Sequence, residues 1–418
     1  MAGGLMQLVA YGAQDVYLTG NPEVTFYQAK YKRHTNFAME NIEQTVNGTA
    51  ANSGRVSVTV ARNGDLVGDM YIELESNAAS SNTSVSSDSC WVAERAVNNV
   101  ELSIGGQRVD KHYQKWWRLY SELYLDEAKK LNWGKMTTGI DGKTVYLPLI
   151  FFFNRNPGLY LPLIALQYHE VRIDIDLASD METYLNKSVF KVWANYVYLD
   201  TEERRRFAQK GHEYLIEQVQ HTGSDTVTSA QTKQVRLSYN HPVKELAFCF
   251  SNTSVATSLW NFTSKSQPGE IILESNVRAN ADANCYVPLG SATGVPVLAL
   301  GTDGSTEDFT EDANGPLDTF KLVLNGQDRF KEQKGKYFNQ VQPYNHHSGC
   351  PYPGVYAFSF ALKPEEHQPT GTCNFSRIDN AQVSVKMNTT DATTMHMFAT
   401  NYNVLRIQSG MGGLAFSN

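Results

Sequence analysis

The stretches VELSIGGQ (residues 100–107) and FKLVLNGQ (residues 320–327) share one pattern. In each, apolar side chains alternate along a segment that ends at a glycine-containing turn, which predicts a β-strand. A second pair, PGLY at 157–160 and PGVY at 353–356, follows in the same order. The offsets of 220 and 196 residues differ by 24. We therefore predict one β-rich domain present twice, with an insertion at 116–144 in the first copy. The alternative is that such strand–turn patterns recur in any all-β protein.

Most of the remaining chain is also predicted to form short strands. The segment 55–75 indicates two strands paired around the turn Arg62-Asn63-Gly64-Asp65, because Asn-Gly between alternating apolar residues is a strong hairpin signal. The other expected strands lie at 90–104, 145–153, 171–177, 189–198, 235–250, 317–324, 337–343, 354–362, 381–387 and 395–407. Residues 76–89 and 276–316 are polar and are expected to be mainly loop. Many short strands predict an all-β sandwich class.

One helix stands out, at Gln114–Leu131, where Trp117, Tyr120, Tyr124 and Ala128 have helical spacing. Alternation is lost and charge rises over 200–220, which predicts a boundary between two domains. The expected organisation is an N-terminal segment at 1–25, a first sandwich at 26–208, a linker at 209–220 and a second sandwich at 221–418.

Composition narrows the class of protein. A chain of 418 residues with 41% hydrophobic residues is long enough for two packed domains. Its net charge of −7 argues against a general nucleic-acid binder. Its few, widely spaced cysteines suit a reducing compartment; they are Cys90, Cys249, Cys285, Cys350 and Cys373. No signal peptide or spanning segment is expected, since the longest apolar block is 146–153. We expect a soluble protein made in the cytosol.

The first 25 residues differ from the rest of the chain. They are apolar, contain no Lys or Arg, and carry only Asp15 and Glu23 as acids. Glycines and an Asn-Pro pair break the segment into short pieces, so it is expected to dock on its own domain, a neighbouring subunit or a membrane. Two basic clusters, Lys30/Lys32/Arg33/His34 and Arg204–Arg206, are either solvated faces or contacts for acidic partners such as lipid head groups.

No motif in the chain predicts catalysis. His346 and His347 lie near Cys350, but they lack a partner at zinc-finger spacing, so structural roles are favoured over a metal site. His169-Glu170 lies in a strand-like run. Gly105-Gly106 and Gly410–Gly413 fit no phosphate-binding loop, and Trp116-Trp117 is expected to be core or interface rather than a ligand platform. We predict no catalytic, cofactor or metal residues, and neither cofactor nor enzymatic activity.

The sequence contains N-x-S/T sites whose use it does not decide. In a secreted chain they would be candidate glycosylation sites, but without a signal peptide they are expected to be chance occurrences in a chain rich in Asn, Ser and Thr. They lie at Asn47, Asn82, Asn186, Asn252, Asn261, Asn374 and Asn388.

Four long stretches resemble the major capsid proteins of nucleocytoplasmic large DNA viruses, most of all those of algal viruses. They are GGLMQLVAYGAQDVYLTGNPEVTFYQAKYKRHTNFA (3–38), FFFNRNPGLYLPLIALQYHEV (151–171), ALKPEEHQPTGTCNFSRID (361–379) and NYNVLRIQSGMGGLAFSN (401–418). The resemblance implies two tandem eight-stranded jelly-roll β-sandwiches with loop and helix insertions. It also implies a non-enzymatic subunit that forms trimeric, pseudo-hexagonal capsomers of an icosahedral shell.

The same resemblance implies partners and a location. The partners are two further copies in a homotrimer, neighbouring capsomers, minor capsid proteins and the surface of an internal viral membrane, without sequence-specific nucleic-acid binding. The protein would belong to the virion capsid and be made and assembled in the host cytoplasm, with its N-terminus on the inner face. The alternative is a carbohydrate-binding or carbohydrate-processing β-sandwich, which only the abundance of aromatic residues supports.

Overall fold

The computed structural model describes residues 3–77, 80–81, 84–85, 91–139, 141–227, 232–252, 262, 315–349, 351, 354–388 and 393–417. The chain divides into two compact units, residues 1–36 and 37–418. Most of the loops expected at 76–89 and 276–316 lie outside the described residues, as do Cys90, Cys285 and Cys350. No described helix is long and apolar enough to cross a membrane.

The first unit holds two short helices, α1 (Gly3–Val9) and α2 (Val16–Thr19). Asp15 precedes α2, and its carboxylate accepts a hydrogen bond from the Gly12 backbone N–H at 2.7 Å. None of the described residues 3–36 is buried. The apolar side chains that the sequence places here therefore lie at the surface.

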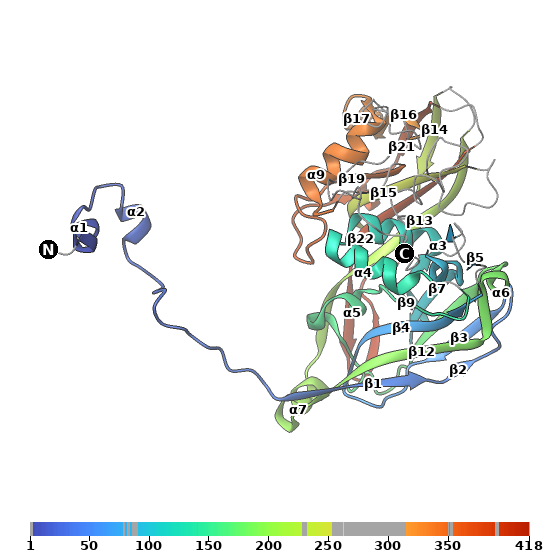
Figure 1. Cartoon of the computed structure of the whole chain (residues 1–418), viewed down its shortest axis with the longest axis horizontal. Coiled ribbons are helices and arrows are strands. Elements are labelled where there is room, and N and C mark those ends of the chain that lie inside the picture. The colour runs from blue at the N-terminus through green and yellow to red at the C-terminus, as the bar shows by residue number, and fades with distance from the viewer. Residues whose placement is uncertain are drawn as a thin grey trace. The chain divides into compact units, whose positions relative to one another are not determined.

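The larger unit begins with a sandwich of two antiparallel sheets, which we call the first roll (Figure 1). Sheet A has the order β1-β12-β4-β10, with β9 also paired to β4. Its strands are β1 Phe37–Gln44, β12 Leu185–Leu199, β4 Leu66–Ser76, β9 Thr144–Pro148 and β10 Leu161–Pro162. Sheet B has the order β2-β3-β11-β7-β8. Its strands are β2 Val46–Asn47, β3 Arg55–Thr59, β11 Val171–Leu177, β7 Val97–Ile104 and β8 Gln107–Tyr113.

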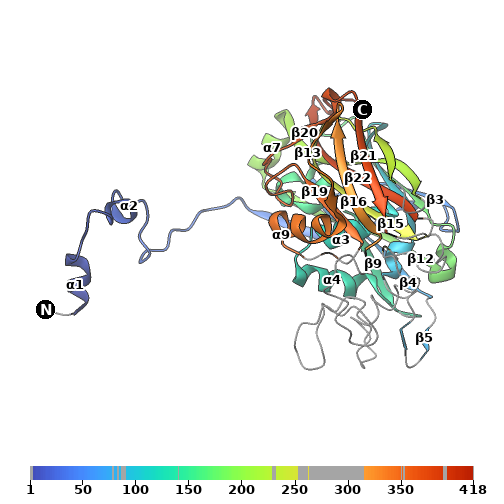
Figure 2. The same cartoon turned by 90° about the horizontal axis from the view of Figure 1, so that it is seen from above.

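A second sandwich, the second roll, follows in the chain (Figure 2). Sheet D has the order β13-β22-β15-β19, and β20 and β23 pair with β15 and β22. Its strands are β13 His212–Val227, β22 Thr393–Gln408, β15 Pro242–Asn252, β19 Val355–Ser359, β20 Cys373–Asn374 and β23 Met411–Leu414. Sheet E has the order β14-β21-β16-β17, with β18 paired to β16. Its strands are β14 Lys233–Leu237, β21 Ala381–Met387, β16 Leu317–Leu324, β17 Gln327–Asp328 and β18 Gln333–Lys334.

The two rolls have the same topology. In chain order, β1, β3, β4, β7, β8, β9, β11 and β12 correspond to β13, β14, β15, β16, β17, β19, β21 and β22. Numbered one to eight, these strands form sheets of order 1-8-3-6 and 2-7-4-5, which is the order of an eight-stranded jelly roll. The all-β double jelly-roll class is thus confirmed.

The two similar stretches VELSIGGQ and FKLVLNGQ form equivalent hairpins in the two rolls. Residues 100–107 join β7 to β8, and residues 320–327 join β16 to β17. Both turns use left-handed backbone, with φ of 58° and 83° at Gly105 and Gly106 and of 51° and 80° at Asn325 and Gly326. Two-residue hairpin turns of type I′ need positive φ at both positions, which is why glycine and asparagine occupy them.

The second paired stretch is not equivalent. Pro157–Leu159 is the 3-10 helix η3, just before β10, whereas Gly354 comes just before β19, the counterpart of β9. The inferred insertion at 116–144 is also not unique to the first roll. The second roll carries its own helix between β18 and β19, formed by the π-helix η5 (Tyr337–Val341) and α9 (Gln342–His346).

Several elements differ in the structure from those predicted from the sequence. The turn at 62–65 does not close a hairpin, because β3 lies in sheet B and β4 in sheet A. The predicted helix breaks after Leu123 into α3 (Gln114–Leu123) and α4 (Glu127–Thr137), where Asp126 caps α4 by accepting from the Lys129 N–H. In its described part, the strand expected at 90–104 is preceded by the 3-10 helix η2 (Val92–Arg95), and the strand expected at 337–343 is helical instead.

The described residues also include several short elements. They are η2 Val92–Arg95, α5 Phe152–Arg155, α6 Met181–Tyr184, α7 Thr201–Gln209, η6 Phe375–Arg377 and the two-stranded sheet β5 Ser80–Ser81 with β6 Ser84–Val85. Residues 212–220 belong to β13 rather than to a connecting segment. The division at 26–208, 209–220 and 221–418 otherwise stays a prediction.

A pair of glycine substitutions tests the β7–β8 turn. A Cβ on Gly105 would lie 2.2 Å from Nδ1 of His169, whereas a Cβ on Gly106 would meet nothing within 4 Å. Both positions have positive φ, so both alanine variants carry backbone strain. We expect Gly105→Ala to lower the melting temperature clearly more than Gly106→Ala, because only the former displaces the His169 ring. Equal losses would contradict this packing.

Candidate functional site

The two rolls meet across the outer face of sheet D. On β15, Leu246, Phe248 and Phe250 point into the core of the second roll. Ala247 and Cys249 point the other way and belong to the hydrophobic core of the first roll. Strand β8 and helices α3 and α5 of the first roll pack against β13, β15 and β19 (Figures 1 and 2). The sheet is therefore buried on both faces.

Aromatic side chains form the apolar part of this contact. The Trp116 ring lies 5.7 Å from the Phe398 ring, and the Tyr113 ring lies 5.0 Å from the His221 ring. Trp116 is 2% exposed and Trp117 is completely buried. Such aromatic pairs add about 0.5–1.5 kcal/mol each beyond the area that they bury. The tryptophan pair thus lies in core and interface.

A buried acid of the second roll accepts hydrogen bonds at the same contact. The Tyr124 hydroxyl, just after α3, donates to Oε2 of Glu245 at 2.6 Å. His347, just after α9, lies with Nε2 2.5 Å from the other Glu245 oxygen, and its Nδ1 lies 3.4 Å from Glu365. Burial alone would lower the pKa of His347, but Glu245 and Glu365 raise it to about 10. His347 is therefore a buried imidazolium at neutral pH.

A second buried carboxylate, Glu217 on β13, binds cations from both rolls. It lies 3.0 Å from Nη2 of Arg155 on α5 and 2.7 Å from Nζ of Lys244. Burial alone would raise the pKa of Glu217, but Arg155 and Lys244 hold it far below its usual value. Removing one partner of a buried ion pair typically costs about 3–5 kcal/mol, because the other charge stays buried. This ion cluster fixes how the two rolls dock.

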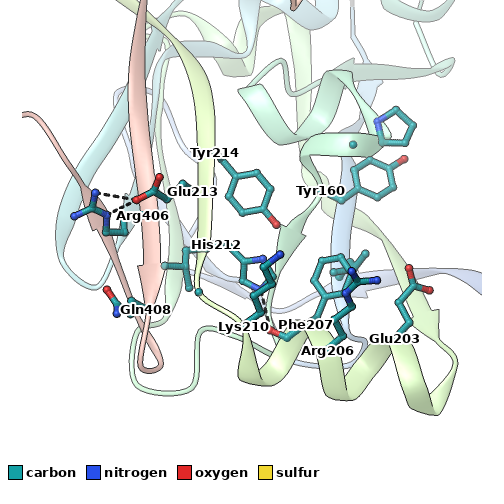
Figure 3. Close-up of a pocket in the computed structure, with 15 residues that line it drawn as sticks. Tyr160, Glu203, Arg206, Phe207, Lys210, His212, Glu213, Tyr214, Arg406 and Gln408 are labelled. Atoms are coloured by element: carbon teal, nitrogen blue, oxygen red, sulfur yellow. Dashed lines mark hydrogen bonds and ion pairs between the residues drawn. The ribbon is translucent and has the colours of Figure 1, made fainter.

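A pocket of about 860 Å³ opens beside this contact. Arg206 and Phe207 of helix α7 and the following Lys210 form its floor, while Tyr160 and Tyr214 lie on opposite sides (Figure 3). The Phe207, His212 and Tyr214 rings stack in sequence, with centroid separations of 5.2 and 6.0 Å. Arg406 and Glu213 pair across β22 and β13 at 2.8 Å. The lining is mixed in charge, and its carboxylates, Glu203 and Glu213, do not face one another as a catalytic pair.

The residues singled out in the sequence fall at separate places. His346 bonds to the Leu362 carbonyl, while its neighbour His347 is in the buried cluster. Nδ1 of His169 lies 2.8 Å from the Gly412 carbonyl, which ties the first roll to β23. Within the described residues, no group of three or more His, Cys, Asp or Glu side chains has the geometry of a metal site.

The basic residues near the domain junction have different roles. Arg204 pairs with the buried carboxylate of Asp65 at 2.8 Å, Arg205 lies 3.6 Å from Glu202, and Arg206 lines the pocket. The cluster at Lys30–His34 lies in the first unit and is exposed. Of the glycosylation motifs, Asn82 and Asn261 lie outside the described residues, and the Asn186 amide donates to Glu75.

Sequence reasoning did not single out Arg155, Glu217, Glu245 or Tyr124 as contact residues. Charged residues at Glu217 and Glu245 interrupt apolar strands, and such residues are almost never fully buried unless they are paired. Nothing local in the sequence identifies their partners, because Tyr124 and Glu245 are 121 positions apart.

Two jelly rolls of identical strand order, joined by a buried contact, define the double jelly-roll class of proteins. The family model described as "Major capsid protein N-terminus" matches residues 25–200, and the model described as "Large eukaryotic DNA virus major capsid protein" matches residues 203–413. The chain belongs to this family of major capsid proteins. Its function is therefore structural, in the virion capsid, and the carbohydrate-related alternative is not supported.

Curated relatives and solved structures agree with this assignment. The chain is 43% identical to the major capsid protein of Paramecium bursaria Chlorella virus 1 and 38% identical to that of Phaeocystis pouchetii virus, over the whole of each chain. A solved structure of the Chlorella virus protein VP54 superposes with a TM-score of 0.76 at 39% identity, covering 94% of this chain and 100% of that one. The Faustovirus major capsid protein shares the fold, with a TM-score of 0.67 at 12% identity, covering 97% of this chain and 96% of that one.

The buried imidazolium predicts a pH dependence of stability. The pKa of His347 is about 10 in the folded chain and about 6.5 when unfolded, so its contribution is complete below pH 6.5 and is lost as the pH rises to 10. We expect His347→Gln to lower the melting temperature most at or below pH 6.5, with the difference from the parent shrinking towards pH 10.

Comparing the parent with His347→Gln isolates the contribution of the His347 charge to the pH dependence of stability. Burial lowers the pKa of Lys115 to about 8, so its effect has the opposite sign, but it is common to parent and variant. His346→Gln is the matched control, because His346 lies outside the buried cluster. A pH-independent loss in His347→Gln would show that His347 contributes packing rather than charge.

Proposed function

We propose that the chain assembles as a homotrimer that forms a pseudo-hexagonal capsomer of an icosahedral shell. The observation that supports this is the identical strand order of the two rolls. Three copies around a three-fold axis would present six similar lobes, and six lobes match a hexagonal lattice. Each subunit contact would join different surfaces of two copies, and the ring of subunits would close at three copies.

The proposed partners follow from this role. They are neighbouring capsomers, minor capsid proteins and the surface of an internal viral membrane, with assembly in the host cytoplasm. We propose no enzymatic activity, no structural metal and no sequence-specific binding of nucleic acid. Finding one zinc or iron per chain by elemental analysis, lost on mutating His346 and His347, would contradict the absence of a metal.

The N-terminal segment at residues 1–25 is proposed to act in assembly on the inner face of the shell. Its large apolar side chains are exposed: Leu5, Met6, Leu8, Val9, Tyr11, Val16, Tyr17, Leu18 and Val24. Burying each large side chain would contribute roughly 1.5–3 kcal/mol, against about 1–2 kcal/mol per residue for ordering the backbone. These two terms are similar in size, which suits a segment that is fixed only when a neighbour or a minor protein covers it.

The proposed homotrimer predicts the mass of the protein in solution. Three subunits of 46.7 kDa give 3 × 46.7 = 140.1 kDa. We expect light scattering coupled to gel filtration to give this mass at micromolar concentration. A mass of 46.7 kDa under these conditions would count against the homotrimer.

Deleting residues 2–25 separates assembly from folding. The truncated chain keeps every buried residue of the larger unit, so we expect trimers whose melting temperature stays within a few degrees of the parent. We also expect these trimers to fail to build shells, as seen by electron microscopy of assembly reactions. A large loss of melting temperature would instead indicate a role in folding, and normal shells would remove the assembly role.

A further inference from the structure

The outer faces of sheets A and D are equivalent in topology but not in exposure. Tyr71 is the sixth residue of β4 and Ala247 is the sixth of β15. Tyr71 pairs with Trp193, and Ala247 pairs with Phe398. Phe398 is 1% exposed because α3 covers it, whereas Trp193 and Tyr71 are partly exposed. One face is covered within the chain, and its counterpart is open.

The open face is aromatic and acidic. The Tyr71 and Tyr146 rings meet edge to face, with their centroids 5.6 Å apart, and the Trp193 indole N–H donates to Glu73 at 2.6 Å. Asp69, the counterpart of the buried Glu245, is exposed here. Phe37 and Met39 on β1 extend the apolar part, with exposures of 53% and 52%. Aromatic side chains gathered on an exposed sheet face are typical of an interface.

The elements that cover sheet D also have counterparts. Helix α3 begins directly after Tyr113 of β8, and the helical segment containing η5 begins directly after Lys334 of β18. His112 pairs with Val100, and Gln333 pairs with the equivalent Phe320. Five positions after His112 and Gln333, Trp117 and Phe338 are both completely buried in their own rolls. The preceding residues, Trp116 and Tyr337, are therefore equivalent as well.

The helix of the second roll exposes the side chains that such a contact needs. Val341 and Tyr344 are 42% and 86% exposed. Residues 328–336, which lead into the helix and form its first two positions, are basic, with Arg329, Lys331, Lys334 and Lys336 against two acids. This charge is complementary to Asp69, Glu73 and Glu75 on sheet A, where Lys191 is the cation that pairs in register with Glu73.

We propose that the η5–α9 helix of one copy packs on the outer face of sheet A of a second copy, as α3 packs on sheet D within the chain. Trp193 and Tyr71 then meet Tyr337, Val341 and Tyr344 of the neighbour. The contact uses two different surfaces and repeats the docking between rolls, so three copies close a ring of six rolls. This inference rests on the proposed homotrimer and assigns the surfaces that form it.

Charge substitution at Tyr344 tests the contact. Tyr344→Glu places an acid against the acidic face of sheet A, whereas Tyr344→Lys places a cation there. We expect the measured mass to fall from 140.1 towards 46.7 kDa in Tyr344→Glu and to change much less in Tyr344→Lys. Tyr168→Glu is the matched control, because Tyr168 is 75% exposed and lies in the loop before β11, outside the surfaces named here. Circular dichroism should show all three variants folded.

Cross-linking gives a second readout. Trp193→Cys combined with Tyr344→Cys, treated with a bis-maleimide, should give covalent dimers and trimers beyond those of each single variant, which control for the native cysteines. A parent that measures 46.7 kDa overturns both the trimer and this contact. A parent trimer that persists in Tyr344→Glu and gives no additional cross-linking overturns the contact alone.

Discussion

The structure depends on burial of the outer face of sheet D. A jelly roll needs only its inner faces covered, and sheet D would otherwise expose Ala247, Cys249 and Phe398 to water. The first roll covers them with Trp116 and the rest of α3. Because the contact continues the hydrophobic core of the first roll, residues 37–418 behave as one unit rather than as two linked domains.

Polar groups give this contact its register. A purely apolar interface tolerates sliding, but Glu217 and Glu245 are buried charges whose partners come from both rolls. A shift of one residue would separate Glu217 from Arg155 and Glu245 from Tyr124, and breaking a buried ion pair costs several kcal/mol. We infer that these carboxylates favour one docking geometry, which a subunit needs if its two lobes are to occupy defined lattice positions.

Strands could be predicted from sequence where one face is buried and the other is wet. Segments 171–177, 317–324 and 381–387 coincide with β11, β16 and β21 because their alternation has a period of two. Strand partners could not be predicted. Asn63-Gly64 indicates a hairpin, yet the two flanking strands, β3 and β4, lie in different sheets, where each pairs with strands that are distant in sequence. Residues 337–343 become helical because Phe338 anchors a helix in the core, and Glu217 and Glu245 are buried only by elements far away in sequence.

The divergence of the two equivalent faces has a physical explanation within the proposed ring. The face covered inside the chain carries Ala247 and Cys249, small side chains that let α3 approach closely and that never meet solvent once the chain has folded. The face proposed to meet another copy carries Tyr71 and Glu73 at the same positions, and a free subunit must keep that face soluble before assembly. Tyrosine and tryptophan provide contact area with little entropy to lose, and the surrounding acids oppose premature association between like faces. The same position in the fold therefore takes an apolar residue where the contact is permanent and an amphipathic or charged residue where it forms later.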